Sequence, residues 1–209
     1  MLRDIRKNYR QFRLEEKDLT PDPHDLFRIW LNHAIESKQE EATAMTLATC
    51  EEGRPDTRIV LLKEFNSDGF IFFTNYNSAK GRQISKNNHV ALNFFWPKPE
   101  RQVRVRGVIE KLGTEQSASY FLSRPRESRL GAWASEQSNE IKDRETLEQR
   151  FRYFQRLFKD QEVKKPDYWG GYLVVPTEIE FWQGRTNRLH DRIRYVFENG
   201  QWTTVRLAP

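Results

Sequence analysis

The feature that most constrains this fold is a series of short β-like runs separated by turn signals. The runs are rich in apolar residues, and Gly, Asn, Asp and Pro punctuate them. They are Thr43–Cys50, Arg58–Lys63, Phe70–Asn75, His89–Trp96, Gln102–Leu112, Trp169–Val175, Ile179–Gln183, Ile193–Phe197 and Trp202–Leu207. Many short strands with few helices between them predict an antiparallel barrel or sandwich, and they argue against a doubly wound parallel sheet.

Sequence signals for helices occur between the strands at four places. Asp22-Pro23 supplies a cap and a first-turn proline for the first helix. Ser78 caps a short helix that runs to about Lys86, and Thr114 caps another that passes through Phe121. The longest helix is expected from about Asp143 to Lys159, because its apolar residues recur on one face.

The chain is expected to divide into a mobile N-terminal arm, residues 1–20, and a single domain, residues 21–209. The first 20 residues are polar and rich in charge, whereas the rest contains no internal repeat and no clear linker. A domain of this size can bury about 70% of its unfolded surface, so it needs no disulfide or metal for stability.

Composition excludes several classes of protein. The single Cys50 rules out an intramolecular disulfide framework and favours a cytoplasmic location. No His or Cys grouping has the spacing of a metal site, so no metal is expected. No run approaches the ~18–20 apolar residues of a membrane span, and Met1–Lys7 is too charged for a secretory signal. The net charge of +5 is spread along the chain, so we expect no nucleic-acid partner.

Two segments bring cations together. If residues 188–192 are extended, Arg188, His190 and Arg192 point the same way, and an anionic or electron-rich ligand would relieve their repulsion. The alternative is a solvated basic edge strand. The second segment, Arg58–Lys63, is an apolar strand with a cation at each end. It is either a ligand-holding strand or a buried strand whose ends reach water.

Two further segments contain residues that could bind a phosphate group. Phe73-Thr74 leads to the Ser78 cap and Lys80, where helix N-terminal N–H groups and an ammonium attract an anion. Tyr120 and Arg124 share a helix face, and Ser128 can fold back toward them because Pro125 ends the helix. Together they form a competent phosphate clamp; the alternative is a loop salt bridge from Arg124 or Arg126 to Glu127.

Taken together, these residues resemble the pyridoxine (pyridoxamine) 5′-phosphate oxidase family over nearly the whole chain. The matching segments are Arg58–Lys63, Ser123–Arg126, Gly131–Trp133, Gln137-Ser138, Trp169–Gly171, Glu180–Gly184, Arg188–Arg192 and Arg206–Pro209. The resemblance implies a mainly β fold with flanking helices, a split β-barrel. It also implies a homodimer with FMN at the subunit interface.

The resemblance also implies roles for individual residues. Flavin contacts fall on Arg58, Ile59, Val60, Leu61, Leu62, Lys63, Phe73, Thr74, Lys80, Gln102, Gln137, Ser138, Trp182 and Arg192. Substrate contacts fall on Lys63, Tyr120, Arg124, Ser128, Arg188, Leu189 and His190, with Arg6 and Tyr9 from a segment that folds over the substrate. Arg188 and His190 are the expected catalytic residues. One departure is Ala79, which stands where the family often has an arginine, so weaker FMN retention is expected.

The implied reaction converts pyridoxine 5′-phosphate or pyridoxamine 5′-phosphate to pyridoxal 5′-phosphate and reduces O2 to hydrogen peroxide. It is the final step of vitamin B6 cofactor synthesis and salvage. Three alternatives stay open: another split-barrel flavoprotein such as a flavin reductase, a non-enzymatic carrier of pyridoxal phosphate, and a nucleic-acid-binding barrel. The joint presence of Tyr120, Arg124, Ser128, Arg188 and His190 argues against the flavin reductase.

Overall fold

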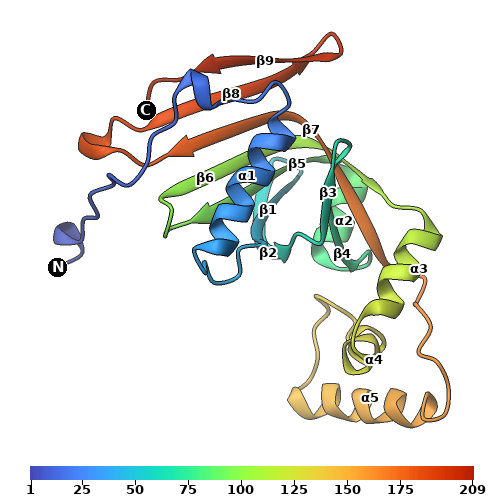
Figure 1. The fold of residues 1–209 in the computed structure, drawn as a ribbon. Coiled ribbons are helices and arrows are strands. Elements are labelled where there is room, and N and C mark those ends of the chain that lie inside the picture. Colours follow the sequence, from blue (N-terminus) through green and yellow to red (C-terminus); the bar gives the residue numbers. More distant parts are fainter.

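A curved antiparallel sheet organises this protein, and helix α1 lies against it (Figure 1). The computed structural model describes residues 1–209. The strands are β1 (Ala44–Glu51), β2 (Arg54–Leu61), β3 (Glu64–Asn66), β4 (Gly69–Asn75), β5 (His89–Trp96), β6 (Arg101–Lys111), β7 (Trp169–Gln183), β8 (Asp191–Glu198) and β9 (Gln201–Arg206). The α-helices are α1 (Pro23–Glu36), α2 (Ala79–Lys86), α3 (Thr114–Ser123), α4 (Arg126–Ala134) and α5 (Arg144–Leu157), and the short 3-10 helices are η1 (Leu2–Asp4), η2 (Glu16–Asp18) and η3 (Thr186–Arg188).

The sheet has the order β2-β1-β5-β6-β7-β4-β3, and the β8–β9 hairpin is added beside β7. Strand β7 pairs with β4 through residues 169–174 and with β8 through residues 178–183, while β6 lies along its other edge. The sheet is therefore open, and it has the mainly β architecture with flanking helices that the split-barrel expectation describes.

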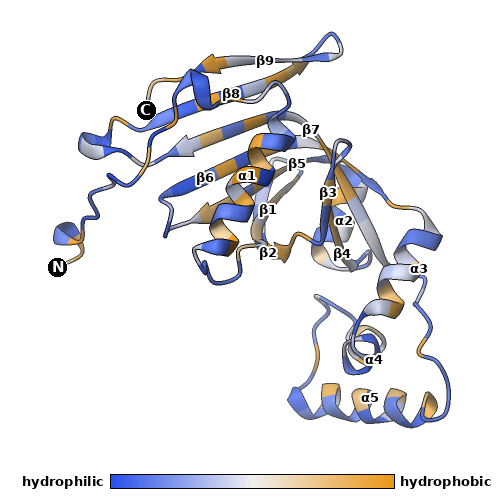
Figure 2. Cartoon of the chain, viewed as in Figure 1, coloured by the Kyte–Doolittle hydropathy of each residue, from blue (hydrophilic) through white to orange (hydrophobic).

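The core fills the concave side of the sheet and the inner face of α1. Its apolar residues include Phe27 and Trp30 of α1 and Phe70, Phe94 and Phe181 of the strands, all fully or almost fully buried. Figure 2 shows apolar positions alternating with polar ones along the outer strands. This alternation is what a sheet with one covered face requires.

Local signals in the sequence place the starts of three helices correctly. The side chains of Asp22, Ser78 and Asp143 accept hydrogen bonds from backbone N–H groups of the first turns of α1, α2 and α5. The hairpin turn at Asn199 and Gly200 is also confirmed, with φ values of 53° and 81°, as a type I′ turn needs.

Four expectations about secondary structure are wrong. Thr114 does not cap α3 but is its first residue, and the N-cap is Gly113, which makes no side-chain hydrogen bond. Residues 169–183 form one strand rather than two, because Pro176 lies at a register shift next to Gly107, where a missing N–H is tolerated. Strand β2 begins at Arg54, since the preceding turn needs only Glu52 and Gly53, both at positive φ. The loop expected after Pro125 is instead helix α4.

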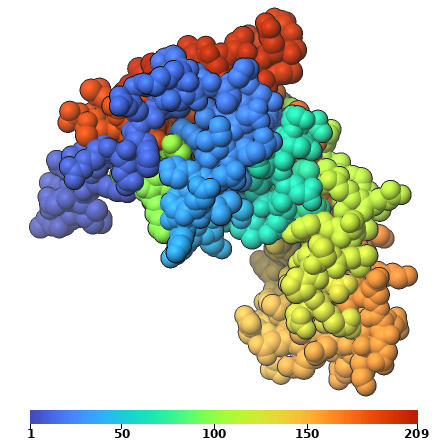
Figure 3. Space-filling model, viewed as in Figure 1, coloured from blue at the N-terminus to red at the C-terminus, as the bar shows by residue number.

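Helices α3, α4 and α5 form a lobe that projects from the sheet (Figures 1 and 3). The lobe has its own small core, in which Phe121, Leu130, Val163 and Trp169 are buried. Helix α5 has no buried residue, although its Phe154 and its C-cap residue Phe158 pack against Trp133 of α4.

The N-terminal end of the chain projects from the body of the protein, and the contacts with the body begin at Lys7 (Figure 1). Leu14 is buried in the main core, and the buried Glu100 carboxylate accepts hydrogen bonds from the amides of Arg10 and Gln11 at 2.9 and 3.1 Å. The division into a mobile arm and one domain stays a prediction.

Candidate functional site

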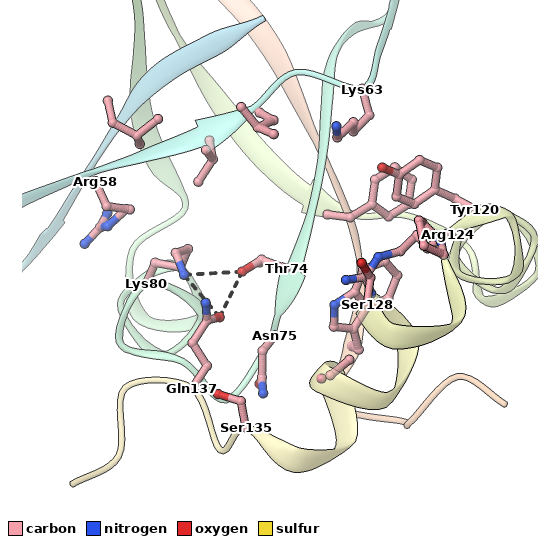
Figure 4. A pocket seen from close by; sticks show the side chains of 18 residues that line it. Arg58, Lys63, Thr74, Asn75, Lys80, Tyr120, Arg124, Ser128, Ser135 and Gln137 are labelled. Atoms are coloured by element: carbon pink, nitrogen blue, oxygen red, sulfur yellow. Dashed lines mark hydrogen bonds between the residues drawn. The ribbon is translucent and has the colours of Figure 1, made fainter. Parts of the chain in front are cut away.

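The largest concentration of predicted site residues surrounds a cavity between the sheet and the lobe (Figure 4). The cavity measures about 780 Å³. Its walls come from β2, β4, the start of α2, helices α3 and α4, the first residue of β7, and the segments that follow β2, α3 and α4. They are Arg58, Ile59, Val60, Leu61, Lys63, Phe73, Thr74, Asn75, Lys80, Tyr120, Arg124, Pro125, Ser128, Gly131, Ala132, Ser135, Gln137 and Trp169.

At one end of the cavity lies a buried lysine without a counter-ion. The Lys80 ammonium is hydrogen-bonded to Thr74 Oγ1, Ser78 Oγ and Gln137 Oε1, each at 3.3 Å. No carboxylate lies within 4.0 Å of it, although the residue is only 8% exposed. Burial, and next the positive charge of Arg58, lower the pKa of Lys80 below its ordinary value. An anion bound here would relieve both effects.

Arg58 lies beside this lysine, but its guanidinium is already engaged. It donates hydrogen bonds to Thr49 Oγ1 at 2.6 Å, Asp56 at 2.6 Å and Gln83 Oε1 at 2.9 Å. Asp56 and Gln83 were missed by the sequence interpretation. Asp56 is two residues before Arg58 on one strand face, a spacing that predicts the pair, whereas nothing local signals Gln83.

Strand β2 is an exposed edge strand rather than a buried one. Ile59 is 64% exposed, and Leu61 is also exposed, whereas Leu62 is buried and does not line the cavity. The backbone of β2 that faces the cavity is therefore accessible to a ligand and to a second polypeptide.

At the other end of the cavity Lys63, Tyr120, Arg124 and Ser128 lie together, as the phosphate-clamp interpretation predicts. Pro125 ends α3 and begins α4, so it places Arg124 and Ser128 on opposite sides of a helix junction. Arg124 Nη1 is buried without a hydrogen-bond partner. The alternative interpretation, a salt bridge from Arg124 or Arg126 to Glu127, is not found; Arg126 donates to the backbone carbonyl of Gln161 instead, at 3.1 Å.

The remaining predicted residues form a second group at the far end of the sheet. Tyr9, Trp182 and His190 pack together there, with ring centroids 4.6 Å apart for Trp182 and His190 and 5.6 Å apart for Tyr9 and Trp182. Gln102 is the cross-strand partner of Trp182, and Trp182 in turn pairs with Arg192. Arg188 and Leu189 are exposed in the preceding turn, and Arg6 is exposed in the arm.

The expectation that Arg188, His190 and Arg192 share the face of one extended segment is wrong. Asn187 and Arg188 have φ values of 57° and 62°, and β8 begins only at Asp191. His190 is fixed by a hydrogen bond instead, because its Nδ1 accepts from the Arg185 amide at 3.1 Å. Burial, and next the charge of Arg188, lower the pKa of His190.

Arg192 is held by a buried carboxylate. Its Nε donates to Glu180 Oε1 at 2.9 Å, and this bond is the main cause of its raised pKa. Glu180 was not singled out as a site residue, although its position two residues before Trp182 in β7 places it beside Arg192.

Within one chain, the residues that line the cavity and the second group around Trp182 and His190 do not come together. Trp169 lines the cavity at the start of β7, and Trp182 lies near its end. An extended strand rises about 3.3 Å per residue, so roughly 40 Å of strand separates them. Gln137 lies in the first group, and Ser138 follows it in the same turn without lining the cavity.

The structure meets the requirements of neither a metal site nor a membrane-spanning helix. No group of three or more His, Cys, Asp or Glu side chains is close enough to hold a metal ion. None of the helices has the length and the apolar character needed to cross a membrane.

Comparison with known proteins gives a consistent result over the whole chain. A family model described as pyridoxamine 5′-phosphate oxidase matches residues 31–158, and one described as the pyridoxine 5′-phosphate oxidase C-terminal dimerisation region matches residues 169–209. The pyridoxine/pyridoxamine 5′-phosphate oxidase of Gloeothece citriformis is 49% identical over 99% of this chain and 97% of its own length. That of Cyanothece sp. is 51% identical over the same shares.

Solved structures show the same fold. PhzG from Burkholderia lata 383, solved with tetrahydrophenazine-1-carboxylic acid, superposes with a TM-score of 0.90 at 27% identity, over 97% of this chain and 100% of its own. A pyridoxamine 5′-phosphate oxidase-related, FMN-binding protein from Nostoc punctiforme has a TM-score of 0.70 at 20% identity, over 91% of this chain and 99% of its own.

Proposed function

The chain belongs to the pyridoxamine 5′-phosphate oxidase family, and from this we propose that it oxidises pyridoxine 5′-phosphate or pyridoxamine 5′-phosphate to pyridoxal 5′-phosphate. The proposal includes FMN as cofactor, O2 as the oxidant and a homodimer as the active form. It also includes a cytoplasmic location, which the lone Cys50 favours.

The residues at the Lys80 end of the cavity fit the phosphate of FMN. A buried ammonium whose only partners are neutral oxygens is costly unless an anion joins it. The N-terminus of α2 adds free backbone N–H groups on the same side. This buried, uncompensated charge is the observation that carries the cofactor assignment.

The proposed flavin contacts are divided between the two ends of the sheet. Lys80, Thr74 and Gln137 lie in the cavity, whereas Gln102, Trp182 and Arg192 lie in the second group. Because roughly 40 Å of strand separates the groups, one copy supplies the cavity half and a second copy supplies the other. The matched C-terminal dimerisation region, residues 169–209, contains most of the second group.

Bound FMN would supply the redox chemistry, namely hydride acceptance from the exocyclic C4′ carbon of the substrate and passage of the two electrons to O2, which is reduced to hydrogen peroxide. With the amine substrate, water would then hydrolyse the substrate imine and release ammonia. The protein supplies position. Lys63, Tyr120, Arg124 and Ser128 bind the substrate phosphate and fix the pyridine ring relative to the cavity wall.

Arg188 and His190 belong to the second group, and they close the active site on that side. Because His190 Nδ1 already accepts a hydrogen bond from the Arg185 amide, the neutral ring carries its proton on Nε2. His190 therefore donates a hydrogen bond to a substrate ring substituent and orients it, and we do not assign it the role of proton acceptor. Tyr9 packs against Trp182 and His190 and covers this half of the site, with Arg6 nearby in sequence.

The test is the visible absorption spectrum of the purified protein, followed by a hydrogen peroxide assay with both phosphorylated substrates. We expect a yellow protein and peroxide formation from at least one of them. Unphosphorylated pyridoxine is the control and should react far more slowly. A reconstituted protein that takes up no FMN would refute the proposal.

A further inference from the structure

We propose that Trp169 is a specificity-determining residue, whose indole face holds the Arg124 guanidinium in the orientation that selects a phosphate monoester. This inference rests on the proposed function, because it concerns the substrate end of the same cavity. Trp169 itself has no polar group directed at a phosphate, so it acts through Arg124.

Arg124 is compensated by aromatic rings and not by a carboxylate. Its Cζ lies 4.7 Å from the ring centroid of Trp169 and 5.5 Å from that of Phe121. No acidic side chain lies within ion-pair distance of it, and its Nη1 is buried without any hydrogen-bond partner. A guanidinium in this setting keeps its charge and its donors available for an incoming anion.

Whether a carboxylate or an aromatic ring lies beside the Arg124 guanidinium affects how it can bind a phosphate. A carboxylate beside Arg124 would neutralise it and compete with the substrate phosphate for the same N–H groups. An aromatic face attracts the cation through its quadrupole but occupies no N–H donor in the guanidinium plane. The aromatic environment therefore stabilises the half-buried cation and leaves Nη1 without a hydrogen-bond partner.

The backbone of Arg124 is fixed separately from its side chain. Arg124 is the C-cap of α3, with φ −74° and ψ 150°, the extended conformation that a following proline imposes. Pro125 then starts α4. Because the backbone is already set, the flanking rings are what determines the direction of the guanidinium.

Trp169 is itself immobilised. It is 6% exposed and lies nearly parallel to Phe73 and Tyr120, with interplanar angles of 11° and 4° and centroid distances of 5.7 and 6.3 Å. Phe121 meets it edge-on at 4.9 Å. A ring held on several sides gives Arg124 a rigid surface.

The test compares phosphorylated with unphosphorylated pyridoxine in Trp169→Leu and Trp169→Phe variants. Loss of the cation–π contact should raise the KM for the phosphate ester about fivefold to thirtyfold in Trp169→Leu. The unphosphorylated substrate should change by less than about twofold, and Trp169→Phe should be intermediate. Trp133→Leu is the matched control, because Trp133 belongs to the same small core and contacts Phe154 and Phe158 instead.

A double-mutant cycle separates this role from a purely structural one. In an Arg124→Ala background, Trp169→Leu should leave the selectivity for phosphate unchanged, since the residue it positions is gone. The inference would be overturned if Trp169→Leu raised the KM equally for both substrates. It would also be overturned if Trp169→Leu still abolished the selectivity for phosphate in the Arg124→Ala background.

Failure of the proposed function has a different signature. If the protein binds no flavin and forms no peroxide, equilibrium binding of pyridoxal 5′-phosphate and of pyridoxal still reports phosphate selectivity through the absorbance of these compounds. The inference survives that case if Trp169→Phe and Trp169→Leu weaken binding of the phosphorylated compound alone, and it fails if they do not.

Discussion

Two impaired variants of this protein should restore each other's activity if, as proposed, each active site of the dimer takes one half from each chain. Arg124→Ala damages the cavity half, and Arg188→Ala damages the half at the far end of β7. In a heterodimer of the two variants, one site combines both damaged halves and the other combines both intact halves. A single chain cannot assemble an intact site, since roughly 40 Å of strand separates the groups.

The expected losses in kcat/KM follow from the charge-assisted hydrogen bonds that each substitution removes. A charge-assisted hydrogen bond contributes ~1.5–3 kcal/mol, so each variant alone should lose about tenfold to 150-fold in kcat/KM. Arg124→Ala should act mainly on KM, whereas Arg188→Ala should also lower kcat. Random exchange makes about half of the dimers mixed, each with one intact site, so activity should recover to about one quarter of the wild-type value.

The assay is peroxide formation at low substrate concentration after co-expression of the two variants with different affinity tags. The matched control pairs Arg124→Ala with Lys63→Ala, whose substitutions lie in the same cavity half. Every mixed dimer of that pair has two damaged sites, so no recovery is expected. Recovery with the control pair, or none with Arg124→Ala and Arg188→Ala, would refute a shared site.

Three further predictions concern the cofactor and the arm. Ala79→Arg should tighten FMN binding about tenfold, because it adds a cation near the Lys80 end of the cavity, and an unchanged dissociation constant from flavin fluorescence quenching would contradict this. FMN affinity should fall as pH rises through the lowered pKa of Lys80, since only the protonated lysine attracts phosphate; Lys80→Arg should remove this pH dependence in the same titration. Glu100→Gln should speed tryptic cleavage at Lys7 or Arg10 severalfold, because the buried carboxylate accepts hydrogen bonds from the amides of Arg10 and Gln11. An equal cleavage rate in Glu100→Gln and in Glu36→Gln, a surface control, would show that Glu100 does not hold the arm.

Local chemistry in the sequence was sufficient for much of the fold. The caps at Asp22, Ser78 and Asp143 and the turn at Asn199-Gly200 depend on neighbouring backbone groups only, so they could be predicted one segment at a time. The same holds for the helix end before Pro125, which explains why Arg124 and Ser128 were expected to be close.

Contacts between distant segments could not be predicted in this way. Whether β7 continues through Pro176 depends on Gly107 in β6, and whether β2 is buried depends on what lies beyond the edge of the sheet. Likewise, the Arg58 partner Gln83 belongs to a helix that the sequence gives no reason to place beside β2.

The sequence alone therefore determined most of the element types and the identity of the ionic residues, because capping, turn formation and periodicity act over a few residues. Only the tertiary structure decided which of those residues meet. It placed the Trp169 ring against Arg124, left Lys80 without a carboxylate and kept His190 far from the cavity along β7. The physical reason is that strand pairing and packing join residues far apart in the chain, and no local pattern specifies the partner.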